Sequence, residues 1–555
     1  MDAPTNSPHY DVVIVGAGFA GLYMLHRLRG AGFKTHVFER ASDVGGTWYW
    51  NRYPGARCDI ESMQYAYSFS PELEQDWEWT ERYATQPEIL RYVNHVAGRF
   101  DLRRDIQFNT RVAAAIFDET DSRWMIETSD GGRTSANYCV IATGCLSTIN
   151  TPNFEGLESF AGSLYHTGEW PHHEIDFSGQ QVGIIGTGSS AIQSIPLIAE
   201  QAKHLYVFQR TPHYTVPACN QPLQTDSRTQ HSGRKAYGYD EDLTMEEIKA
   251  DYLGLRERAR KTFAALAFTP NPRSALEMTE TERQQEFENR WKRGGLPFQG
   301  VFRDFAVSRE ANELAAEFVR QKIQHIVKDS VVAEALLPTY TIGCKRLAVD
   351  TGYYETYNRP NVTLVNVSKS PIERITPAGV YALGREYPLD SLIMATGFDA
   401  MTGTLLKINI QGRGGLRLHE KWAEGPRAYL GLCLAGFPNL FTITGPGSPS
   451  VLTNMLLSIE QHVDWIVDCL EYLRDRNIAE IEPTLEAENE WVTHNNEVAS
   501  DHIRNSCSSW YVGGNIEGKP RVFMPYVGGF QNYVEKCRNI ATTGYKGFVL
   551  RGVGS

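Results

Sequence analysis

Phe160-Ala-Gly-Ser-Leu-Tyr-His166-Thr-Gly-Glu-Trp170-Pro171 lies between two glycine fingerprints of the chain. The first is Gly16-Ala-Gly18-Phe-Ala-Gly21, and the second, Gly186-Thr-Gly188-Ser-Ser-Ala191, begins shortly after this stretch ends. Such a fingerprint is typical of a dinucleotide-binding fold when a buried strand precedes it and a helix follows it. The arrangement therefore predicts an α/β protein with two Rossmann-like domains that meet near this stretch.

The bulk composition bounds the class of protein. At 555 residues the chain is too long for a single core, so two or three domains are expected. The formal net charge of -12 argues against a nucleic-acid partner, which would favour a basic surface. No apolar run is long enough to span a bilayer, and residues 1–10 carry no Lys or Arg. We therefore expect neither a membrane anchor nor a secretory leader, and a monomer or weak homo-oligomer.

The cysteines exclude further classes of protein. Nine of them are scattered along the chain without a CxxC pair or a Cys/His cluster, which argues against a metal site. A redox-relay reductase would need a CxxC pair beside its flavin. An odd number of cysteines without a disulfide framework fits a reducing cytoplasm.

The first fingerprint has the context that a dinucleotide site requires. An apolar run, 11–15, reads as a buried parallel strand, and a helix-like segment, 22–29, follows the glycines. The glycines allow a tight turn and place a pyrophosphate at the helix N-terminus. The next predicted strand, 34–38, ends in Glu39, whose carboxylate can accept hydrogen bonds from a ribose. Because Glu39 would repel a 2′-phosphate, this site is expected to hold FAD or NAD.

The second fingerprint differs at the corresponding position. A predicted strand, 182–185, precedes it, and the next strand, 204–208, is followed by Gln209-Arg210-Thr211 in place of an acid. A guanidinium can bind a 2′-phosphate by paired, charge-assisted hydrogen bonds. The contrast with Glu39 favours this interpretation over an ordinary surface arginine, so we assign FAD to the first fold and NADPH to the second. The residues expected to contact NADPH here are Gly186, Gly188, Ser189, Ser190, Arg210 and Thr211.

The spacing Phe160-x-Gly-x-x-x-His166-x-x-x-Trp170-Pro171 resembles the signature of the type I Baeyer–Villiger monooxygenases. These flavoproteins insert oxygen beside a ketone carbonyl. The alternative is a linker with a buried tryptophan and a solvated histidine, which the position between two dinucleotide folds disfavours. The resemblance implies that His166, included among the catalytic candidates, orients domains and cofactors rather than exchanging protons.

Three further segments extend the resemblance. The aromatic, glycine-rich run 45–59 is similar to the flavin-lining segment of the phenylacetone and steroid monooxygenase branch of the family. Lys345-Arg346 matches the family's Lys-Arg pair, and Ser509-Trp510-Tyr511 matches a segment whose tryptophan reaches the NADP ribose. The residues that this likeness adds to the cofactor site are Gly46, Thr47, Trp48, Asp59, Lys345, Arg346 and Trp510.

The resemblance also implies specific roles for the charged residues. Lys345 would bind the 2′-phosphate, and Arg346 would point toward the flavin and pair with Asp59. The simpler alternatives are an aromatic core loop, an ion pair between Asp59 and the neighbouring Arg57, and solvated charges at the Lys-Arg pair.

The order of the motifs predicts one domain inserted within another. We expect an FAD domain from 1–144 and 388–555, an NADP domain from 145–219 and 338–387, and a helical insertion, 220–337, near the substrate entrance. Cys145 is expected to be a buried, unreactive thiol, because nothing nearby in sequence lowers its pKa. The residues expected to line the substrate pocket are Ile60, Cys145, Leu146, Ser450, Val451, Leu452 and Met455.

The leading hypothesis is an FAD- and NADPH-dependent monooxygenase that converts a ketone to an ester or lactone. By resemblance, NADPH reduces FAD, O2 adds at flavin C4a as a peroxide, and its anion attacks the carbonyl while Arg346 stabilises the charge. A flavin-containing N- or S-monooxygenase is the nearest competing enzyme. A flavin-binding redox sensor without turnover is the competitor outside the enzyme classes.

Overall fold

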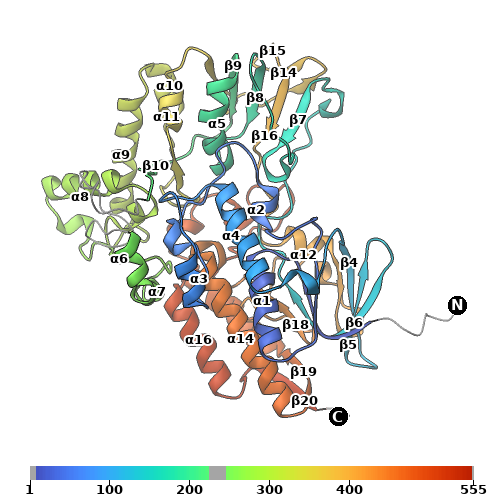
Figure 1. Cartoon of the computed structure of the whole chain (residues 1–555). Helices are drawn as coiled ribbons and strands as arrows, with labels where there is room; N and C mark the ends of the chain where they lie inside the picture. Colours follow the sequence, from blue (N-terminus) through green and yellow to red (C-terminus); the bar gives the residue numbers. More distant parts are fainter. Residues whose placement is uncertain (1–7, 224–244, 553–555) are drawn as a thin grey trace.

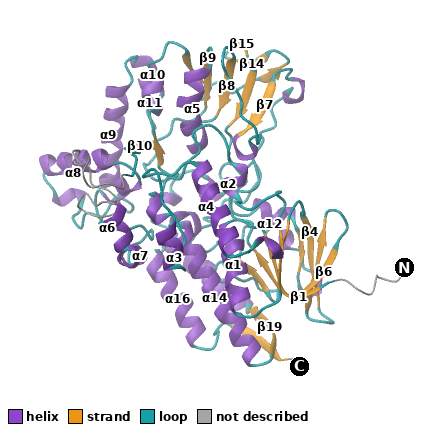
Figure 2. Ribbon diagram, in the orientation of Figure 1, coloured by secondary structure: helices purple, strands orange, loops and turns teal. Residues whose placement is uncertain are grey.

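Two sheets organise the residues that the computed structural model describes, which are 8–223 and 245–552. Figure 1 shows two lobes, one above the other, with the helices α6–α8 projecting on the left near the level at which the lobes meet. Figure 2 shows that both lobes combine helices with strands, as expected for an α/β protein with two Rossmann-like folds. The predicted fold class is confirmed.

The sheet of the lower lobe draws on two distant parts of the chain. Its order is β17-β4-β5-β6-β1-β2-β3, and β18 pairs with β6. Val12, Val13 and Ile14 of β1 are fully buried, as is usual for a parallel strand that is covered on both faces. The strands are β1 His9–Val15, β2 Thr35–Phe38, β3 Ile106–Gln107, β4 Val112–Asp118, β5 Arg123–Thr128, β6 Arg133–Ile141, β17 Asn409–Gln411 and β18 Leu440–Thr442.

Two long helices cover this sheet. Helix α1, Phe19–Gly30, follows the first fingerprint, and α14, Met455–Asp475, packs against it. The Tyr23 hydroxyl donates to Asp464 over 2.8 Å, which fixes the two helices side by side. The first fingerprint therefore lies between β1 and α1, and α14, from the C-terminal part of the chain, packs against α1.

The sheet of the upper lobe is entirely parallel, with the order β12-β9-β8-β16-β7. We expected residues from 388 onward to return to the first domain, but β16 lies between β8 and β7 in this second sheet. The boundary predicted at 388 is therefore too early, and the strand belongs with the second fingerprint. The strands are β7 Ser163–His166, β8 Gln181–Ile185, β9 His204–Gln209, β12 Val362–Asn366 and β16 Ser391–Met394.

Helices dominate the segment between the two parts of the upper lobe. Residues 220–337 were predicted to form a helical insertion, and helices run through the part of it that lies within the described residues; 224–244 lie outside them. Buried Arg256 ties this region to the lower lobe by donating to the carbonyls of Gln64 and Ala66 at 2.9 and 3.0 Å. The helices are α6 Met245–Ala250, α7 Tyr252–Arg260, α8 Glu280–Arg293, α9 Arg309–Ile326 and α10 Ser330–Ala335.

The remaining elements connect or cap these parts. The other helices are α2 Thr47–Trp50, α3 Pro71–Asp76, α4 Gln86–Arg99, α5 Ser189–Gln201, α11 Tyr353–Thr356, α12 Gly403–Lys407, α13 Leu418–Lys421, α15 Leu485–Ala499 and α16 Phe530–Thr542. The other strands are β10 Thr215–Pro217, β11 Ala348–Asp350, β13 Arg374–Thr376, β14 Gly379–Ala382, β15 Arg385–Pro388, β19 Ile478–Pro483 and β20 Phe548–Gly552.

Two further expectations from the sequence concern membrane-spanning helices and the cysteines. Within the described parts of the chain, no helix combines the length and apolar character that crossing a bilayer requires. The cysteine prediction is wrong for one pair, because Cys344 and Cys507 form a disulfide, while the other seven cysteines form none. The partners are 163 residues apart and only the fold brings them together, so their spacing carried no signal.

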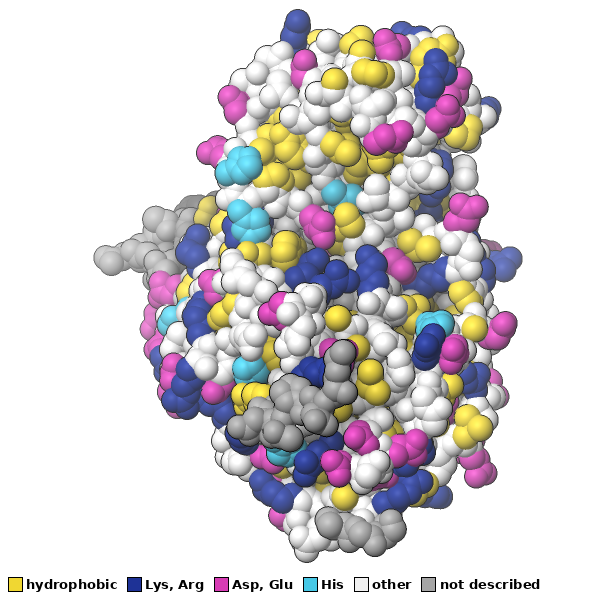
Figure 3. All heavy atoms as spheres, turned by 90° about the vertical axis from the view of Figure 1, so that its right-hand side faces the viewer, with side chains coloured by type: hydrophobic (Ala, Val, Ile, Leu, Met, Phe, Trp, Pro, Cys, Tyr) yellow, Lys and Arg dark blue, Asp and Glu magenta, His cyan; other side chains and the backbone are white. Residues whose placement is uncertain are grey.

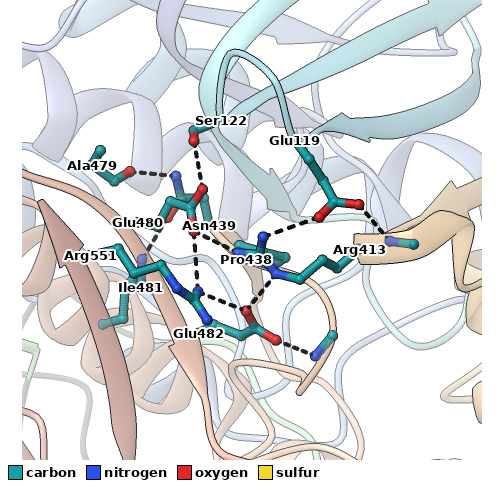
Figure 4. A network of polar contacts seen from close by, with 12 residues as sticks. Glu119, Ser122, Arg413, Pro438, Asn439, Ala479, Glu480, Ile481, Glu482 and Arg551 are labelled. Carbon is teal, nitrogen blue, oxygen red and sulfur yellow. Dashed lines mark hydrogen bonds and ion pairs between the residues drawn. The ribbon is translucent and has the colours of Figure 1, made fainter. Parts of the chain in front are cut away.

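An ion-pair network fastens the two-stranded antiparallel sheet of β19 and β20 to the first sheet (Figure 4). Arg413 pairs with Glu480 and with Glu482, and Arg551 reaches both carboxylates at 3.2 Å. Burial acts to raise the pKa of Glu480, but hydrogen bonds from Ser122 and Arg413 outweigh it and hold this pKa below its ordinary value.

Arg413→Met is expected to lower the free energy of unfolding by about 2 kcal/mol, between the values typical of exposed and of buried pairs. Because the pKa of Glu480 is depressed in the fold, its contribution is present above about pH 4.5 and is lost as the pH falls through the depressed value. Urea denaturation at pH 7 and pH 3.5 measures both effects. Arg104→Met, which removes the pairs of an exposed arginine with Asp101 and Asp105, is the control, and an equal loss in both variants would contradict the network's role.

Candidate active site

A cavity of about 1570 Å³ lies where the two fingerprints face each other. Gly16 and Gly18 line one part of it, and Gly186 and Gly188 line another. This volume exceeds the range of about 300–1,000 Å³ that is usual for one small ligand. The cavity therefore has room for two large ligands, one at each fingerprint.

The glycine positions test whether dinucleotides fit. Gly16 has φ +107°, and a Cβ there would lie 2.8 Å from the Ala142 carbonyl oxygen, so only glycine makes this turn. At Gly186 a Cβ would lie 2.3 Å from the Ala395 carbonyl, whereas at Gly188 it would meet no atom within 4 Å. The backbone at Gly188 is thus open to a close ligand. Both turns fit the approach of a pyrophosphate to a helix N-terminus.

Glu39 lies at the expected end of the first fold and lines the cavity. Its carboxylate is buried and accepts hydrogen bonds from the backbone N–H groups of Ala17 at 2.6 Å and Ala41 at 2.7 Å. Burial raises the pKa of Glu39, and the two backbone donors oppose this shift. Such a fixed acceptor suits a ribose hydroxyl and disfavours a phosphate, as the sequence predicted.

Arg210 and Lys345 come together at the second fold, although they are far apart in sequence. Arg210 is exposed and Lys345 is half-buried. Burial lowers the pKa of Lys345, and the nearby charge of Arg210 lowers it further. Among the described residues, no ion pair joins either cation to a carboxylate. Two adjacent cations without an acid have the charge that suits a dianionic phosphate.

Arg346 and Asp59 form a two-point ion pair in the cavity wall. Arg346 Nε donates to Asp59 Oδ2 over 2.6 Å and Nη2 donates to Oδ1 over 2.8 Å, while Nη1 donates to the Val451 carbonyl over 2.8 Å. Burial acts to lower the pKa of Arg346, but the Asp59 charge outweighs it and raises this pKa. The alternative partner of Asp59 is excluded, because Arg57 pairs instead with Glu81 at 3.0 Å.

His213 was missed by the sequence analysis and lies directly behind Arg346. Its Nε2 is 2.8 Å from the Arg346 carbonyl, and the Tyr340 hydroxyl is 2.8 Å from its Nδ1. Since a carbonyl can only accept, Nε2 carries the proton and Tyr340 donates to Nδ1. Burial lowers the pKa of His213 to about 4, so this neutral form holds the backbone of Arg346 at ordinary pH.

The described residues that line the cavity do not include His166. Its Nδ1 accepts from the Gly168 N–H over 2.9 Å, and its Nε2 lies 3.3 Å from the Asn150 carbonyl and 3.2 Å from Thr396 Oγ1. Burial lowers the pKa of His166. The next residue, Thr167, lies 3.0 Å from the Ser190 hydroxyl at the start of α5. The Phe160–Pro171 stretch thus links the chain at Asn150 and Thr396 to the start of α5 at the second fingerprint.

Of the other predicted site residues, three do not line the cavity and the rest do. Gly21 faces the backbone of Gly16 rather than the cavity, since a Cβ there would lie 1.8 Å from the Gly16 carbonyl. Ser450 is fully buried with its hydroxyl 3.2 Å from the Thr444 carbonyl, and Leu452 packs into an apolar cluster, so neither lines the cavity. The predicted residues that do line it also include Gly46, Thr47, Trp48, Ile60, Cys145, Leu146, Ser189, Ser190, Thr211, Val451, Met455 and Trp510.

Cys145 is buried, as predicted, and burial raises the pKa of its thiol to about 11. Among the described residues, five lining cations were not predicted as site residues: Arg40, Arg57, Arg111, Lys407 and Arg521. Figure 3 shows lysine and arginine side chains gathered across the middle of one face, at the level between the lobes. The overall net charge of -12 gives no sign of this local positive charge, because only the fold brings these cations together.

Comparisons with known proteins agree with this geometry. Residues 13–232 match the family model described as pyridine nucleotide-disulphide oxidoreductase. A solved structure described as oxidized steroid monooxygenase bound to NADP is 51% identical, with a TM-score of 0.91, and the match covers 98% of this chain and 99% of that one.

Two curated relatives match over almost their whole length. A Baeyer–Villiger monooxygenase of Pseudooceanicola batsensis is 42% identical over 544 residues, which are 97% of this chain and 96% of the relative. A phenazine N-monooxygenase of Lysobacter antibioticus is 40% identical over 546 residues, covering 98% and 97%. With both fingerprints, the Arg346–Asp59 pair and the Phe160–Pro171 stretch in place, the chain belongs to the Baeyer–Villiger monooxygenase family.

Proposed function

We propose that the first sheet holds FAD, that the second sheet holds NADPH, and that the Arg346–Asp59 wall is where oxygen is transferred to a ketone. The protein is an FAD- and NADPH-dependent monooxygenase that uses O2. In domain terms we assign 1–144 and 395–555 to FAD, and 145–219 and 338–394 to NADPH. The observation that carries the proposal is the two-point pair between Arg346 and Asp59 inside the shared cavity.

When bound, the two cofactors supply the reducing power and activate O2 for insertion beside the carbonyl. The protein's part is to supply fixed charge and to exclude water. Among the described residues, Asp59 and the Val451 carbonyl engage three N–H groups of Arg346, which leaves two of its five donors. These two are available to the oxygen on which negative charge develops. Because Asp59 and His213 already hold the group in place, little reorganisation is needed as the reaction proceeds.

The substrate class follows from the lining near Arg346. The apolar side chains of Ile60, Leu146, Val451 and Met455 surround this part of the cavity, so it suits an uncharged carbonyl compound. We assign ketones as the substrate class and esters or lactones as the products.

The test is an assay of the purified protein with linear, cyclic, aryl and steroid ketones under ¹⁸O2. NADPH consumption should rise with at least one ketone, and mass spectrometry should find one ¹⁸O atom in the ester. If no ketone raises NADPH consumption, the protein is a flavin-binding sensor or acts on another substrate class, and the proposal fails.

N-oxygenation is the second candidate, because one close relative is named a phenazine N-monooxygenase. The Phe160–Pro171 stretch and the Lys345-Arg346 pair favour the ketone reaction, since they match the signature of the ketone oxidisers. Phenazines, amines and sulfides belong in the same assay. Oxygenated heteroatom products in the absence of any ester would reverse the order of the two candidates.

His166→Ala is expected to keep FAD bound but to lower turnover about 10-fold, because the links from His166 to Asn150 and Thr396 are lost. His173→Ala, an exposed neighbour, is the matched control. Flavin content and ester formation measure the two properties separately. A His166 variant with the turnover of the control would reduce the stretch to a passive linker.

A further inference from the structure

The Cys344–Cys507 disulfide joins two segments that both line the cavity. Cys344 immediately precedes Lys345 and Arg346, and Cys507 immediately precedes the segment 508–510, which contains Trp510. The Cα atoms of the two cysteines are 6.0 Å apart. The bond therefore connects the segment that carries the cation of the proposed oxygenation site with a second segment of the cavity wall.

Neither segment belongs to a long regular element. Residues 344–346 lie in a connection before the three-residue strand β11, and 508–512 hold only the three-residue 3-10 helix Trp510–Val512. Short irregular segments have few cooperative backbone hydrogen bonds and are among the easiest parts of a fold to displace. Isolated backbone hydrogen bonds, such as that from the Met524 N–H to the Tyr511 carbonyl, and side-chain contacts place these segments, and the covalent bond joins them directly.

The contacts of the two segments are unequal. Arg346 is held by Asp59, by the Val451 carbonyl and, through its own carbonyl, by His213. Trp510 instead lies beside Tyr511, with ring centroids 4.3 Å apart, and Tyr511 packs into an apolar cluster with Cys145 and Val451. The disulfide thus joins the Trp510 segment, which packing and a few backbone hydrogen bonds hold, to the Arg346 segment, which an ion pair holds.

We propose that Cys344 and Cys507 are positioning residues for oxygen transfer, because their bond fixes the Trp510 segment against the Arg346 segment. The inference rests on the proposed function of Arg346. It predicts that the closed bond keeps NADPH oxidation coupled to ester formation, and that opening the bond leaves cofactor binding intact but wastes reducing power as hydrogen peroxide.

The bond can be opened by a dithiol. A thiolate of dithiothreitol attacks one sulfur of the bond and releases the other cysteine. The second thiol of the reagent then attacks the mixed disulfide and releases the remaining cysteine, and the reagent leaves as its cyclic disulfide. The protein gains two electrons and two protons and ends with two thiols. The proposed oxygenation does not itself require this reduction of the disulfide.

The first measurement is a thiol count in denatured protein. Seven of the nine cysteines form no disulfide, so seven thiols are expected without reductant and nine after reduction. Nine thiols in protein purified without reductant would show that the bond is absent and would overturn the inference.

The second measurement is the yield of ester per NADPH consumed. Treatment of the wild-type enzyme with dithiothreitol, or the double variant Cys344→Ser with Cys507→Ser, should lower this ratio at least about 10-fold while flavin content is unchanged. The double variant treated with dithiothreitol is the matched control and should show no further change. If the double variant does not fold, the reduced wild-type enzyme still gives the answer.

The outcomes separate a positioning role from a purely structural one. A lower melting temperature with an unchanged ester-to-NADPH ratio would mean that the bond only stabilises the fold, and the inference would be wrong. If the untreated wild-type enzyme makes no ester from any ketone, the proposed function fails instead.

Discussion

Arg346→Ala is expected to bind FAD and NADPH but to form ester at least about 10³-fold more slowly than the wild-type enzyme. Arg346 makes its side-chain hydrogen bonds with Asp59 and with the Val451 carbonyl, and none with Glu39 or Arg210 is found among the described residues. Negative charge that develops on oxygen in a buried site without a cation has a large desolvation cost. The reacting oxygen should then be released as hydrogen peroxide. Steady-state ester formation and peroxide release measure the outcome.

Two further variants sharpen this prediction. Arg346→Lys keeps the positive charge but loses the planar fork that engages Asp59 at two points, so it should retain little activity. Arg359→Ala removes an exposed arginine and should behave like the wild-type enzyme. Substantial ester formation by Arg346→Lys would mean that charge alone suffices and that the fork geometry is irrelevant.

Arg210→Ala should remove most of the preference for NADPH over NADH. A charge-assisted hydrogen bond contributes about 1.5–3 kcal/mol, which corresponds to roughly a 10- to 150-fold change in the ratio of the two kcat/KM values. Among the described residues no carboxylate pairs with Arg210 or Lys345, so both cations remain available to a 2′-phosphate. The loss should come almost wholly from weaker use of NADPH, because NADH lacks that phosphate.

Lys345→Ala should weaken the same preference, and the double variant should use the two nucleotides about equally. Lys203→Ala removes an exposed cation from the same lobe and serves as the control. A wild-type enzyme that uses NADH as well as NADPH would contradict the assignment of the second fingerprint.

Short patterns in the sequence predict much of the fold. The strand, glycine turn, helix and terminal acid at Glu39 lie within thirty residues, and each element follows from backbone sterics or burial. The boundary at 388 failed for a physical reason. A short apolar parallel strand such as β16 looks the same in either sheet, and only its pairing with β8 and β7 decides its place.

The site was predicted less completely than the fold. The Arg346–Asp59 pair joins residues 287 apart and was expected only through the family resemblance. The pocket prediction failed at Ser450 and Leu452, because the tight 3-10 turn that contains them directs only Val451 to the cavity. His213 and the Cys344–Cys507 bond had no signal, since their partners are distant in sequence.

A single-turnover experiment on Arg346→Ala tests the central claim most directly. The variant is first reduced by NADPH without oxygen and is then mixed with O2 and a ketone that the wild-type enzyme accepts. If Arg346 serves oxygen transfer through its fixed charge, the flavin is reduced, O2 is consumed, and hydrogen peroxide forms without ester. Ester formation in the wild-type yield after the same mixing would contradict the role assigned to Arg346.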